Sequence, residues 1–435
     1  MTKILFYNHT AKVSGAERVL LLILSQLDRN EFTPLVLCPK GALQTMVEVK
    51  NVSCLTVEKL EARFTWRPDY LLRYLGSFFR VMRNVRKQVI QAAPDLIHAN
   101  SIRAGLVMTA ATIGCRVPVV WHLHDMLPRH LLSTAIRVVT LSSSRLRMLA
   151  VSQATAEKFR GLLLLPFAQR VPVKVILNCA DTEKFQPNAA SRKALRAEFG
   201  LAENTPVIGI IGQITKRKGQ LGLLEAFASV VREIPTAILL VVGEPLFTAA
   251  DEEYYQCLKR IAEELGIARQ VHFSGARHDI PAVMQALDLL VVNSLAEPCG
   301  LVVLEGMASG LPVIATAVGG NPEMIYHAVS GWLVPAQDNQ ALAEAIIKLI
   351  QSPSLCQLLR KNSRLRVVEQ FTVAAFMSAL EDFYLWNNSG NPVATALGTV
   401  PCAVASQVLL GTVPRAVASR VPLLRDCSLP NIQRT

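Results

Sequence analysis

Residues 294–325 read SLAEPCGLVVLEGMASGLPVIATAVGGNPEMI, and two of their carboxylates, Glu297 and Glu305, lie eight positions apart. Glu297 lies in a predicted loop, and Glu305 lies within the predicted helix that follows it. Gly310 and Pro312 predict the end of that helix, and another apolar strand follows them. A helix enclosed by two apolar strands is typical of a parallel sheet covered by helices on both faces.

The same alternation extends outward from this segment in both directions. Strand-like apolar runs are predicted at residues 3–8, 34–38, 94–100, 118–125, 206–213, 237–244, 270–275, 287–294, 311–318 and 331–336. Helices are predicted around residues 18–27, 219–232, 251–265, 281–286, 301–309 and 340–351.

The pattern predicts an α/β protein made of two Rossmann-like, doubly wound domains that face each other across a cleft. The turn-forming residues of VILNCADTEKFQP place the join near residue 186, so the domains are predicted over 1–185 and 186–386. Ligands of such sheets bind at the carboxyl ends of the strands. Residues 387–435 are rich in Ala, Val, Ser and Pro and are predicted to form a loosely ordered tail.

Positive charge is concentrated in the first half. Residues 1–185 contain 25 Lys and Arg against 12 Asp and Glu, whereas residues 186–386 contain 16 against 20. A positive first domain favours an anionic partner such as phospholipid or a phosphate-containing substrate, although solubility alone would also explain the charge.

The nine cysteines include no C-x-x-C pair. Their odd number argues against a disulfide framework or a zinc site and predicts a cytoplasmic protein that can lie at the inner face of the membrane. No N-terminal signal is visible, because the apolar run after Lys3 is too short. The uncharged stretch Val393–Gly411 is a weak transmembrane candidate, because it contains Pro401.

The segment that contains both glutamates resembles the signature of family-4 glycosyltransferases with the GT-B fold. The resemblance rests on the two glutamates, on a Gly-Leu-Pro-Val turn and on a Gly-Gly-Asn-Pro-Glu loop, and it follows the pattern over nearly all 32 residues. The alternative, an exposed helix with two ordinary acids, does not explain so long a match.

A second resemblance lies in GQITKRKGQLGLLEAFA, residues 212–228. It implies that Gly212 belongs to the donor site and that Lys218 forms an ion pair with the leaving diphosphate. Gln213 stands where the family often has Arg, with Lys216 and Arg217 nearby. Taken alone, this segment would be read as a solvated basic turn.

The N-terminal segment NHTAKVSGAERVL, residues 8–20, resembles the family's loop of small residues followed by Ala-Glu-Arg. The resemblance implies that Ser14 and Gly15 let the donor phosphates and the acceptor approach the backbone. Ser14 stands where the family usually has a first glycine.

The resemblance also matches His124 in VVWHLHD to the family's histidine that contacts the transferred sugar. A lone histidine is more often a core or surface residue, but His124 ends a strand that is expected to face the cleft, and Asp125 follows it. His98 and His122 have no such support and are read as ordinary histidines.

Breaking a sugar–phosphate bond places positive charge on the anomeric carbon and negative charge on the departing diphosphate. The chain contains no Asp-x-Asp motif, so we expect no metal, and cations and helix N-termini must stabilise the diphosphate. No cofactor is expected, because the nucleotide sugar is a co-substrate.

The resemblance implies that Glu305 hydrogen-bonds the ribose hydroxyls and that Glu297 contacts hydroxyls of the sugar. Backbone N–H groups then assist at three positions, namely Cys299, Gly300 and Leu301. Family members retain the anomeric configuration, so the expected enzyme is a retaining hexosyltransferase of polysaccharide or glycolipid biosynthesis. Its acceptor would be a lipid-linked molecule, a glycan or a small molecule. No residue identifies itself as a nucleophile.

Residues 61–90 combine cations with aromatic side chains, and from Asp69 onward they predict one amphipathic helix. Such a helix can lie in an anionic membrane surface. It can equally pack on a core and leave a solvated basic rim, and the periodicity does not distinguish the two. No nucleic-acid partner is expected, because no nucleic-acid module is recognisable.

Two other functions remain open. The departures from the family pattern at Ser14, Cys179 and Gln213 are compatible with a catalytically weak nucleotide-sugar-binding partner subunit. A phosphorylase or an epimerase of the same fold is the third candidate, which the motifs favour less.

Overall fold

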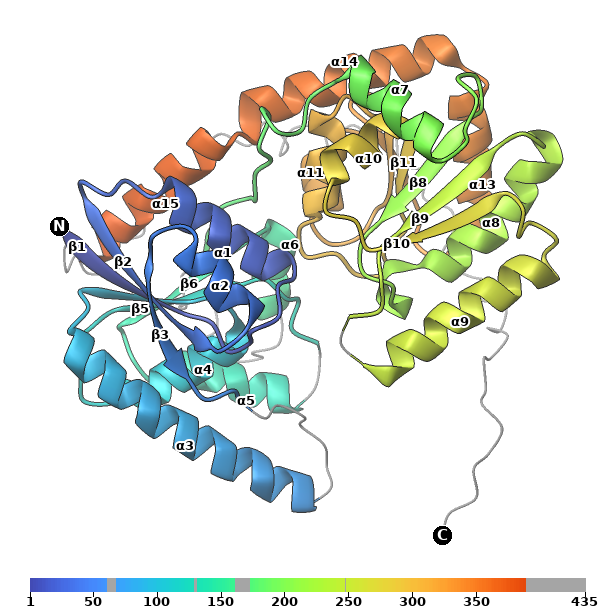
Figure 1. The fold of residues 1–435 in the computed structure, drawn as a ribbon. Coiled ribbons are helices and arrows are strands. Elements are labelled where there is room, and N and C mark those ends of the chain that lie inside the picture. The colour runs from blue at the N-terminus through green and yellow to red at the C-terminus, as the bar shows by residue number, and fades with distance from the viewer. Residues whose placement is uncertain (61–67, 129–130, 161–172, 247, 389–435) are drawn as a thin grey trace. The chain divides into compact units, whose positions relative to one another are not determined.

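The computed structural model describes residues 1–60, 68–128, 131–160, 173–246 and 248–388, without the side chains of 68–72 and 131–132. Within these ranges the chain forms two parallel β-sheets, each with its own helices (Figure 1). This arrangement confirms the α/β class and the two Rossmann-like units.

The first sheet has seven strands in the order β3-β2-β1-β4-β5-β6-β7. They are β1 (Thr2–Tyr7), β2 (Phe32–Pro39), β3 (Ser53–Val57), β4 (Leu96–Ala99), β5 (Val119–Leu123), β6 (Leu146–Ala150) and β7 (Val173–Val175). Its helices are α1 (Gly15–Gln26), α2 (Ala42–Glu48), α3 (Pro68–Ala92), α4 (Ile102–Ala111), α5 (Leu131–Thr140) and α6 (Gln153–Arg160).

All five residues of β5 are buried, as expected of a central strand that is covered on both faces. The neighbours of β5 in the sheet are β4 and β6, and β1 lies beyond β4. The carboxyl ends of β1, β4 and β5 therefore lie side by side, and the segments that follow them come together.

The second sheet has six strands in the order β10-β9-β8-β11-β12-β13. They are β8 (Val207–Ile211), β9 (Ile238–Val242), β10 (Val271–Gly275), β11 (Leu289–Val292), β12 (Val313–Thr316) and β13 (Trp332–Val334). All six coincide with strands predicted from the sequence. Because β8, β11 and β12 are neighbours, the loops after their carboxyl ends meet at one edge.

The second half also contains a short 3-10 helix and nine α-helices within the described residues. These are η2 (Lys216–Lys218), α7 (Ala189–Glu198), α8 (Gln220–Glu233), α9 (Ala249–Glu264), α10 (Ile280–Ala286), α11 (Leu301–Ala308), α12 (Asn321–Met324), α13 (Asn339–Ile350), α14 (Pro353–Gln370) and α15 (Val373–Asn388).

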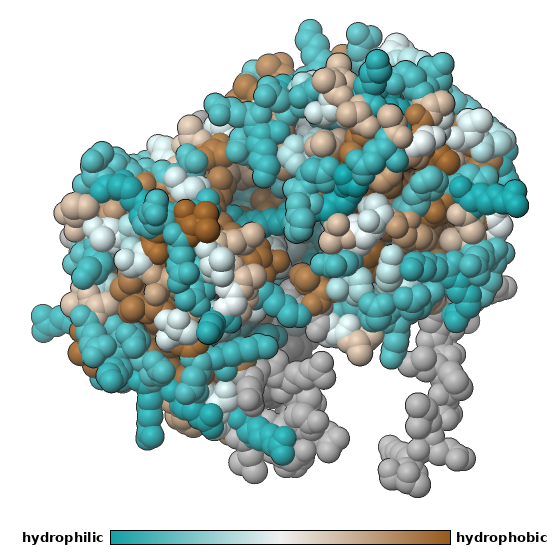
Figure 2. All heavy atoms as spheres, viewed as in Figure 1, coloured by the Kyte–Doolittle hydropathy of each residue, from teal (hydrophilic) through white to brown (hydrophobic). Residues whose placement is uncertain are grey.

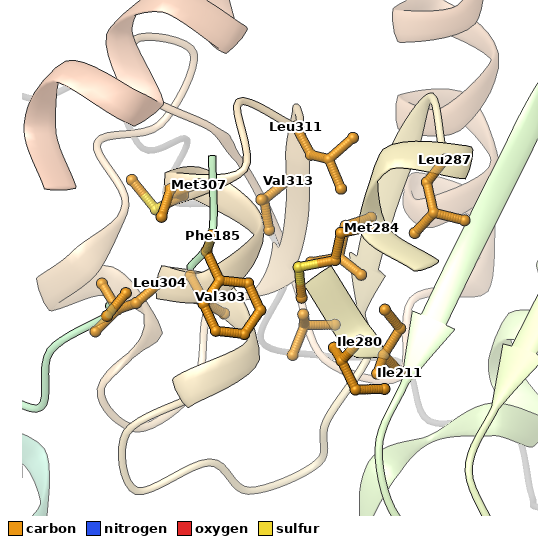
Figure 3. Close-up of a cluster of buried hydrophobic side chains, with 14 of the residues drawn as sticks. Phe185, Ile211, Ile280, Met284, Leu287, Val303, Leu304, Met307, Leu311 and Val313 are labelled. Carbon is orange, nitrogen blue, oxygen red and sulfur yellow. The ribbon is translucent and has the colours of Figure 1, made fainter. Parts of the chain in front are cut away.

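A hydrophobic core fixes α11 against the second sheet (Figure 3). Val303, Leu304 and Met307 of α11 are fully buried in this core. Gly306 lets the helix approach β11, because a Cβ atom there would lie 2.3 Å from a methyl carbon of Leu290. The position of the helix, and of the glutamate that it carries, is therefore set by close packing.

The last described helix, α15, lies almost entirely within the range 186–386 predicted for the second domain and ends two residues beyond it. Its buried side chains nevertheless pack in the core of the first sheet, where Phe376, Leu380 and Tyr384 join Phe6 of β1 and Val120 of β5. The chain therefore returns to the first sheet after completing the second.

The basic amphipathic helix is observed as α3, and its apolar stripe packs on the first core through Val81, Val85 and Val89. Arg86 turns toward the protein and donates hydrogen bonds to the carbonyl oxygens of Ala111 and Ile113. The apolar stripe of α3 therefore packs on the core, as one of the two interpretations of residues 61–90 predicts. Hydrophilic side chains dominate the visible surface over this helix (Figure 2).

No helix in the described part of the chain combines the length and hydropathy that a membrane span requires. The weak candidate at 393–411 lies outside the described residues, as do residues 61–67 of the basic segment.

Candidate functional site

The carboxyl ends of β8, β11 and β12 carry the residues predicted to bind the donor. Gly212 directly follows β8 and has a φ of 148°, a conformation that favours glycine. Gly319 follows β12 with a φ of 54°, and a Cβ atom there would lie 1.8 Å from the carbonyl oxygen of Glu297. The loop that carries Glu297 can therefore close against the 317–320 loop only when residue 319 is glycine.

Glu297 and Lys218 form an ion pair with 2.5 Å between Nζ and Oε2. Both side chains are largely buried, with exposed fractions of 7% and 17%. Ser294 Oγ donates a second hydrogen bond, of 2.9 Å, to the same carboxylate oxygen. The structure thus brings together two of the predicted catalytic residues, which are 79 positions apart in the sequence.

Gly219, the residue directly after Lys218, holds this ion pair in place. Gly219 ends η2 with a φ of 69°, and a Cβ atom there would lie 2.0 Å from the carbonyl oxygen of Asn293. The amide of Asn293 donates in return to the carbonyl oxygen of Gly219. Lys218 is therefore held against the end of β11, where the loop that contains Glu297 begins.

The N-terminus of α11 lies at the end of this loop, with Gly300 as its N-cap. Among the described residues, none accepts a hydrogen bond from the backbone N–H of Cys299, Gly300 or Leu301. Free N–H groups at a helix start carry partial positive charge and bind anions. Little space for a side chain exists at residue 300, because a Cβ atom there would lie 3.2 Å from Asn321 Oδ1 and 3.3 Å from Glu297 Cγ.

Cys299 contributes no reactive thiol to this site. Its side chain is buried, and burial raises the pKa of the thiol to about 12. The thiol is therefore protonated at neutral pH, and only the backbone of Cys299 is available to a ligand.

Glu305 is half-buried on α11, and no described residue donates a hydrogen bond to its carboxylate. Burial raises the pKa of this carboxyl, and the positive charges of Arg18 and Lys184 oppose that shift. A carboxylate that is partly desolvated without a donor is costly, and a ligand that supplies hydroxyl donors relieves the cost.

A small cavity extends from these groups below the carboxyl ends of β8 and β11. It is lined by residues that include Gly212, Lys218, Gln220, Asn293 and Ser294. Sequence reasoning missed Gln220, Asn293 and Ser294. The only available signal was their position directly after a predicted strand or at the start of a predicted helix, which does not distinguish them from ordinary polar residues.

The predicted residues of the first half gather at the carboxyl ends of β1, β4 and β5. His124 follows β5, and its Nε2 lies 3.2 Å from Oδ1 of Asn100, which follows β4. Burial lowers the pKa of His124 to about 3, so its ring is neutral at physiological pH. Ser14 is the N-cap of α1, and its N–H and hydroxyl both donate to the carboxylate of Glu17.

Gly15, the first residue of α1, is exposed. A Cβ atom at Gly15 would lie 3.8 Å from a methyl carbon of Leu301 at the start of α11. No described contact joins His124 to Glu297 or to Lys218. The predicted residues therefore form two groups, one at the end of each sheet, and the groups adjoin where Gly15 lies beside Leu301.

No cluster of three or more metal-binding side chains occurs within the residues that the structure describes.

The chain matches two family models, one over most of each half. Residues 13–184 match the model described as glycosyltransferase family 4, and residues 191–366 match the model described as glycosyl transferases group 1. A D-inositol 3-phosphate glycosyltransferase of Saccharomonospora viridis is 30% identical over 306 residues, which cover 67% of this chain and 69% of the relative. The chain belongs to the group 1 glycosyltransferases.

A second relative is matched over most of its length. UDP-Gal:alpha-D-GlcNAc-diphosphoundecaprenol alpha-1,3-galactosyltransferase of Escherichia coli is 24% identical over 383 residues, which cover 86% of this chain and 94% of the relative. Other curated relatives are matched over about half of their length, 44% and 52% in two cases.

Among solved structures, Anabaena Alr3699/HepE in complex with UDP-glucose is similar with a TM-score of 0.76 and 28% identity. The match covers 89% of this chain and 100% of that one. Together with the two parallel sheets, this likeness establishes the GT-B fold.

Proposed function

We propose that this glycosyltransferase is a retaining, metal-independent hexosyltransferase that uses a nucleoside diphosphate sugar as donor. The observation that carries the proposal is the combination of three features at one edge of the second sheet. These features are the buried Lys218–Glu297 pair, the free N–H groups at the start of α11, and the half-buried Glu305 without a described donor.

Glu305 is the group that receives the nucleotide. Two adjacent ribose hydroxyls can donate to its two carboxylate oxygens, which relieves the desolvation that raises its pKa. UDP is the first nucleotide to test, because the solved relative from Anabaena was crystallised with UDP-glucose.

The leaving diphosphate is stabilised by fixed positive groups of the protein. Lys218 is paired with Glu297 in the ligand-free structure, and a diphosphate beside it offers a stronger partner for the ammonium group. Glu297 then accepts hydrogen bonds from hydroxyls of the transferred sugar, while the N–H groups of Gly300 and Leu301 face the phosphate. Apart from this exchange of partner by Lys218, the groups are held in place before the donor binds, so they stabilise the developing charge with little reorganisation.

Retention is proposed from the resemblance of residues 294–325 to the retaining family-4 enzymes. Among the described residues at this edge no side chain is placed as a nucleophile, which disfavours a covalent glycosyl intermediate. In the donor complex Glu297 accepts hydrogen bonds from Ser294 and from the sugar hydroxyls, and the thiol of Cys299 is protonated. The acceptor hydroxyl would then attack from the face that the diphosphate leaves, and the diphosphate oxygen would take its proton.

The acceptor is proposed to be a lipid-linked molecule or a glycan at an anionic membrane surface. The Escherichia coli relative is named for a diphosphoundecaprenol acceptor. On α3 the basic residues Arg73, Arg83 and Lys87 are exposed, together with the apolar Phe79 and Ile90. Exposed cations beside apolar side chains suit a surface of anionic headgroups.

The test uses donor labelled with carbon-13 in the sugar, a membrane lipid extract as acceptor, and either EDTA or Mg²⁺. We expect equal transfer in both, and a product whose anomeric proton coupling matches the donor configuration. Transfer that requires Mg²⁺ would contradict metal independence, and an inverted coupling would contradict retention. Donor binding without transfer to any acceptor would instead favour a partner subunit.

Membrane binding is tested separately by sedimentation with vesicles that contain or lack phosphatidylglycerol. An Arg83→Gln/Lys87→Gln variant should bind the anionic vesicles less tightly at low salt. Equal binding of the variant would remove α3 from the account without affecting the donor site.

A further inference from the structure

A chain of buried side chains connects His124 to the N-terminal loop. Oδ1 of Asn100 lies 3.2 Å from Nε2 of His124, and Nδ2 of Asn100 lies 3.0 Å from Oδ1 of Asn8. Nδ2 of Asn8 lies 3.2 Å from Oε1 of Glu17, whose other oxygen accepts the N–H and hydroxyl of Ser14. Asn8 and Asn100 are fully buried, and Glu17 is 3% exposed.

In this network of side chains, carbonyl and carboxylate oxygens that can only accept hydrogen bonds determine which atom donates in each bond. Nδ2 of Asn100 also faces the backbone carbonyl oxygen of Ala16, at 3.2 Å, so this atom must be the amide nitrogen. Nδ2 of Asn8 likewise faces the carbonyl oxygen of Thr10 at 2.8 Å. The amide oxygen of Asn100 therefore points to His124, and only an N–H of the imidazole can bond to it.

A neutral imidazole carries one hydrogen on its two nitrogens. Because Nε2–H of His124 donates to Asn100, Nδ1 holds the lone pair. No described residue hydrogen-bonds this Nδ1. The ring of His122 lies with its centroid 3.9 Å from that of His124 and limits the ring on one side.

We infer that Asn100 is a positioning residue that holds His124 as the Nε2–H tautomer, so that the lone pair of Nδ1 faces a substrate hydroxyl. Asn8 and Glu17 fix the orientation of Asn100 and tie the same network to Ser14 at the start of α1. This inference rests on the proposed function, because it assigns His124 the part of a hydrogen-bond acceptor in sugar transfer.

The inference is tested first without any substrate. The full-length protein is labelled with nitrogen-15 in histidine, and the His124 resonances are assigned by their loss in His124→Gln. Two-bond proton–nitrogen correlations at neutral pH should show His124 as the Nε2–H tautomer in the wild type. A Nδ1–H tautomer, or a mixture of both, would overturn the inference. This readout does not depend on activity.

Kinetics then test whether Asn100 acts through His124. We expect Asn100→Ala to lower kcat by about 10- to 100-fold with little change in KM for the donor, since misplacement of a reacting group has effects of this size. In a His124→Ala background the same change should alter kcat by less than about twofold, because the two residues act as a unit. An equal loss in both backgrounds would overturn the positioning role.

Asn387→Ala provides a matched control, because Asn387 is a buried asparagine whose Nδ2 donates, among the described residues, to the nearby carbonyl oxygen of Phe383 alone. It should leave kcat unchanged. If the wild type transfers no sugar from any donor, the proposed function fails, while the tautomer measurement still decides whether the network holds His124.

Discussion

Replacing Glu305 by Gln should weaken nucleotide binding and stabilise the protein at the same time. The carboxylate is half-buried and receives no hydrogen bond from a described residue, and burial raises its pKa. The amide keeps the shape of the side chain but removes the charge. Binding and folding should therefore respond in opposite directions, which general damage to the fold would not produce.

The size of the binding effect follows from the two ribose hydroxyls. A hydrogen bond to a charged group contributes about 1.5–3 kcal/mol, compared with about 1 kcal/mol for a neutral pair. Losing the charge at two such bonds should cost about 1–4 kcal/mol, which corresponds to roughly 5- to 1,000-fold weaker binding. Titration calorimetry with UDP in the presence of EDTA measures this difference.

The stability gain should depend on pH in one direction. At low pH the Glu305 carboxyl is protonated in both the folded and the unfolded state, so variant and wild type are equally stable. Because the folded pKa is raised, the charged form costs the wild type stability as pH rises above the ordinary range of Glu. The variant should therefore unfold at a higher temperature near pH 8 but not near pH 3.

Glu233→Gln is the matched control, because Glu233 is an exposed carboxylate at the end of α8. It should change neither UDP affinity nor thermal stability. If Glu305→Gln bound UDP as tightly as the wild type, or unfolded at a lower temperature near pH 8, the assignment of Glu305 as the nucleotide-binding carboxylate would be refuted.

Three further changes test the packing around the two groups of predicted residues. Lys218→Met should lower the free energy of unfolding in urea by about 3 kcal/mol, because it leaves the buried carboxylate of Glu297 without its cation. The double variant with Glu297→Gln should recover part of that loss, and strictly additive losses would contradict the pairing. Gly319→Ala should cost about 2–4 kcal/mol in the same assay, since a methyl group collides with a backbone oxygen; an unchanged midpoint would contradict the close approach. Tyr384→Phe should cost about 1–3 kcal/mol because a buried histidine loses its partner, whereas Tyr7→Phe, which removes a buried hydroxyl without a described partner, should cost nothing. Equal effects of the two tyrosine changes would contradict the hydrogen bond between Tyr384 and His98.

The sequence predicted the second sheet better than the first. All six strands of the second sheet are apolar runs bounded by glycine, proline or polar residues, which is the pattern of a buried parallel strand. The strands β3, β6 and β7 were missed, because SCLTV, LRMLA and VKV are short and interrupted by polar side chains. β3 and β7 are the edge strands of the first sheet, and each has a single buried residue.

The packing of α15 on the first core could not be predicted from local pattern. Phe376, Leu380 and Tyr384 show that the helix has a buried face, but not which sheet covers it. Tertiary contacts determine which sheet covers this face. One of them is the 2.7 Å hydrogen bond between Tyr384 and His98, which are 286 positions apart in the sequence.

The candidate site was predictable where it is contiguous in the sequence. Glu297, Gly300 and Glu305 belong to one strand–loop–helix unit, so their relative positions follow from the element boundaries. The Lys218–Glu297 pair and the Asn8–Asn100 contact join separate units. Strand order determines which loops meet, and no local pattern reports that order.

The chain itself is proposed to transfer sugar from a nucleotide donor at the Glu305 site. The most direct test of this transfer is the release of nucleoside diphosphate from UDP-, GDP- and ADP-sugars in EDTA, with and without membrane lipid extract. We predict acceptor-dependent release from one class of donor by the wild type and its loss in Glu305→Ala. No release from any donor, or equal release by Glu305→Ala, would contradict the account.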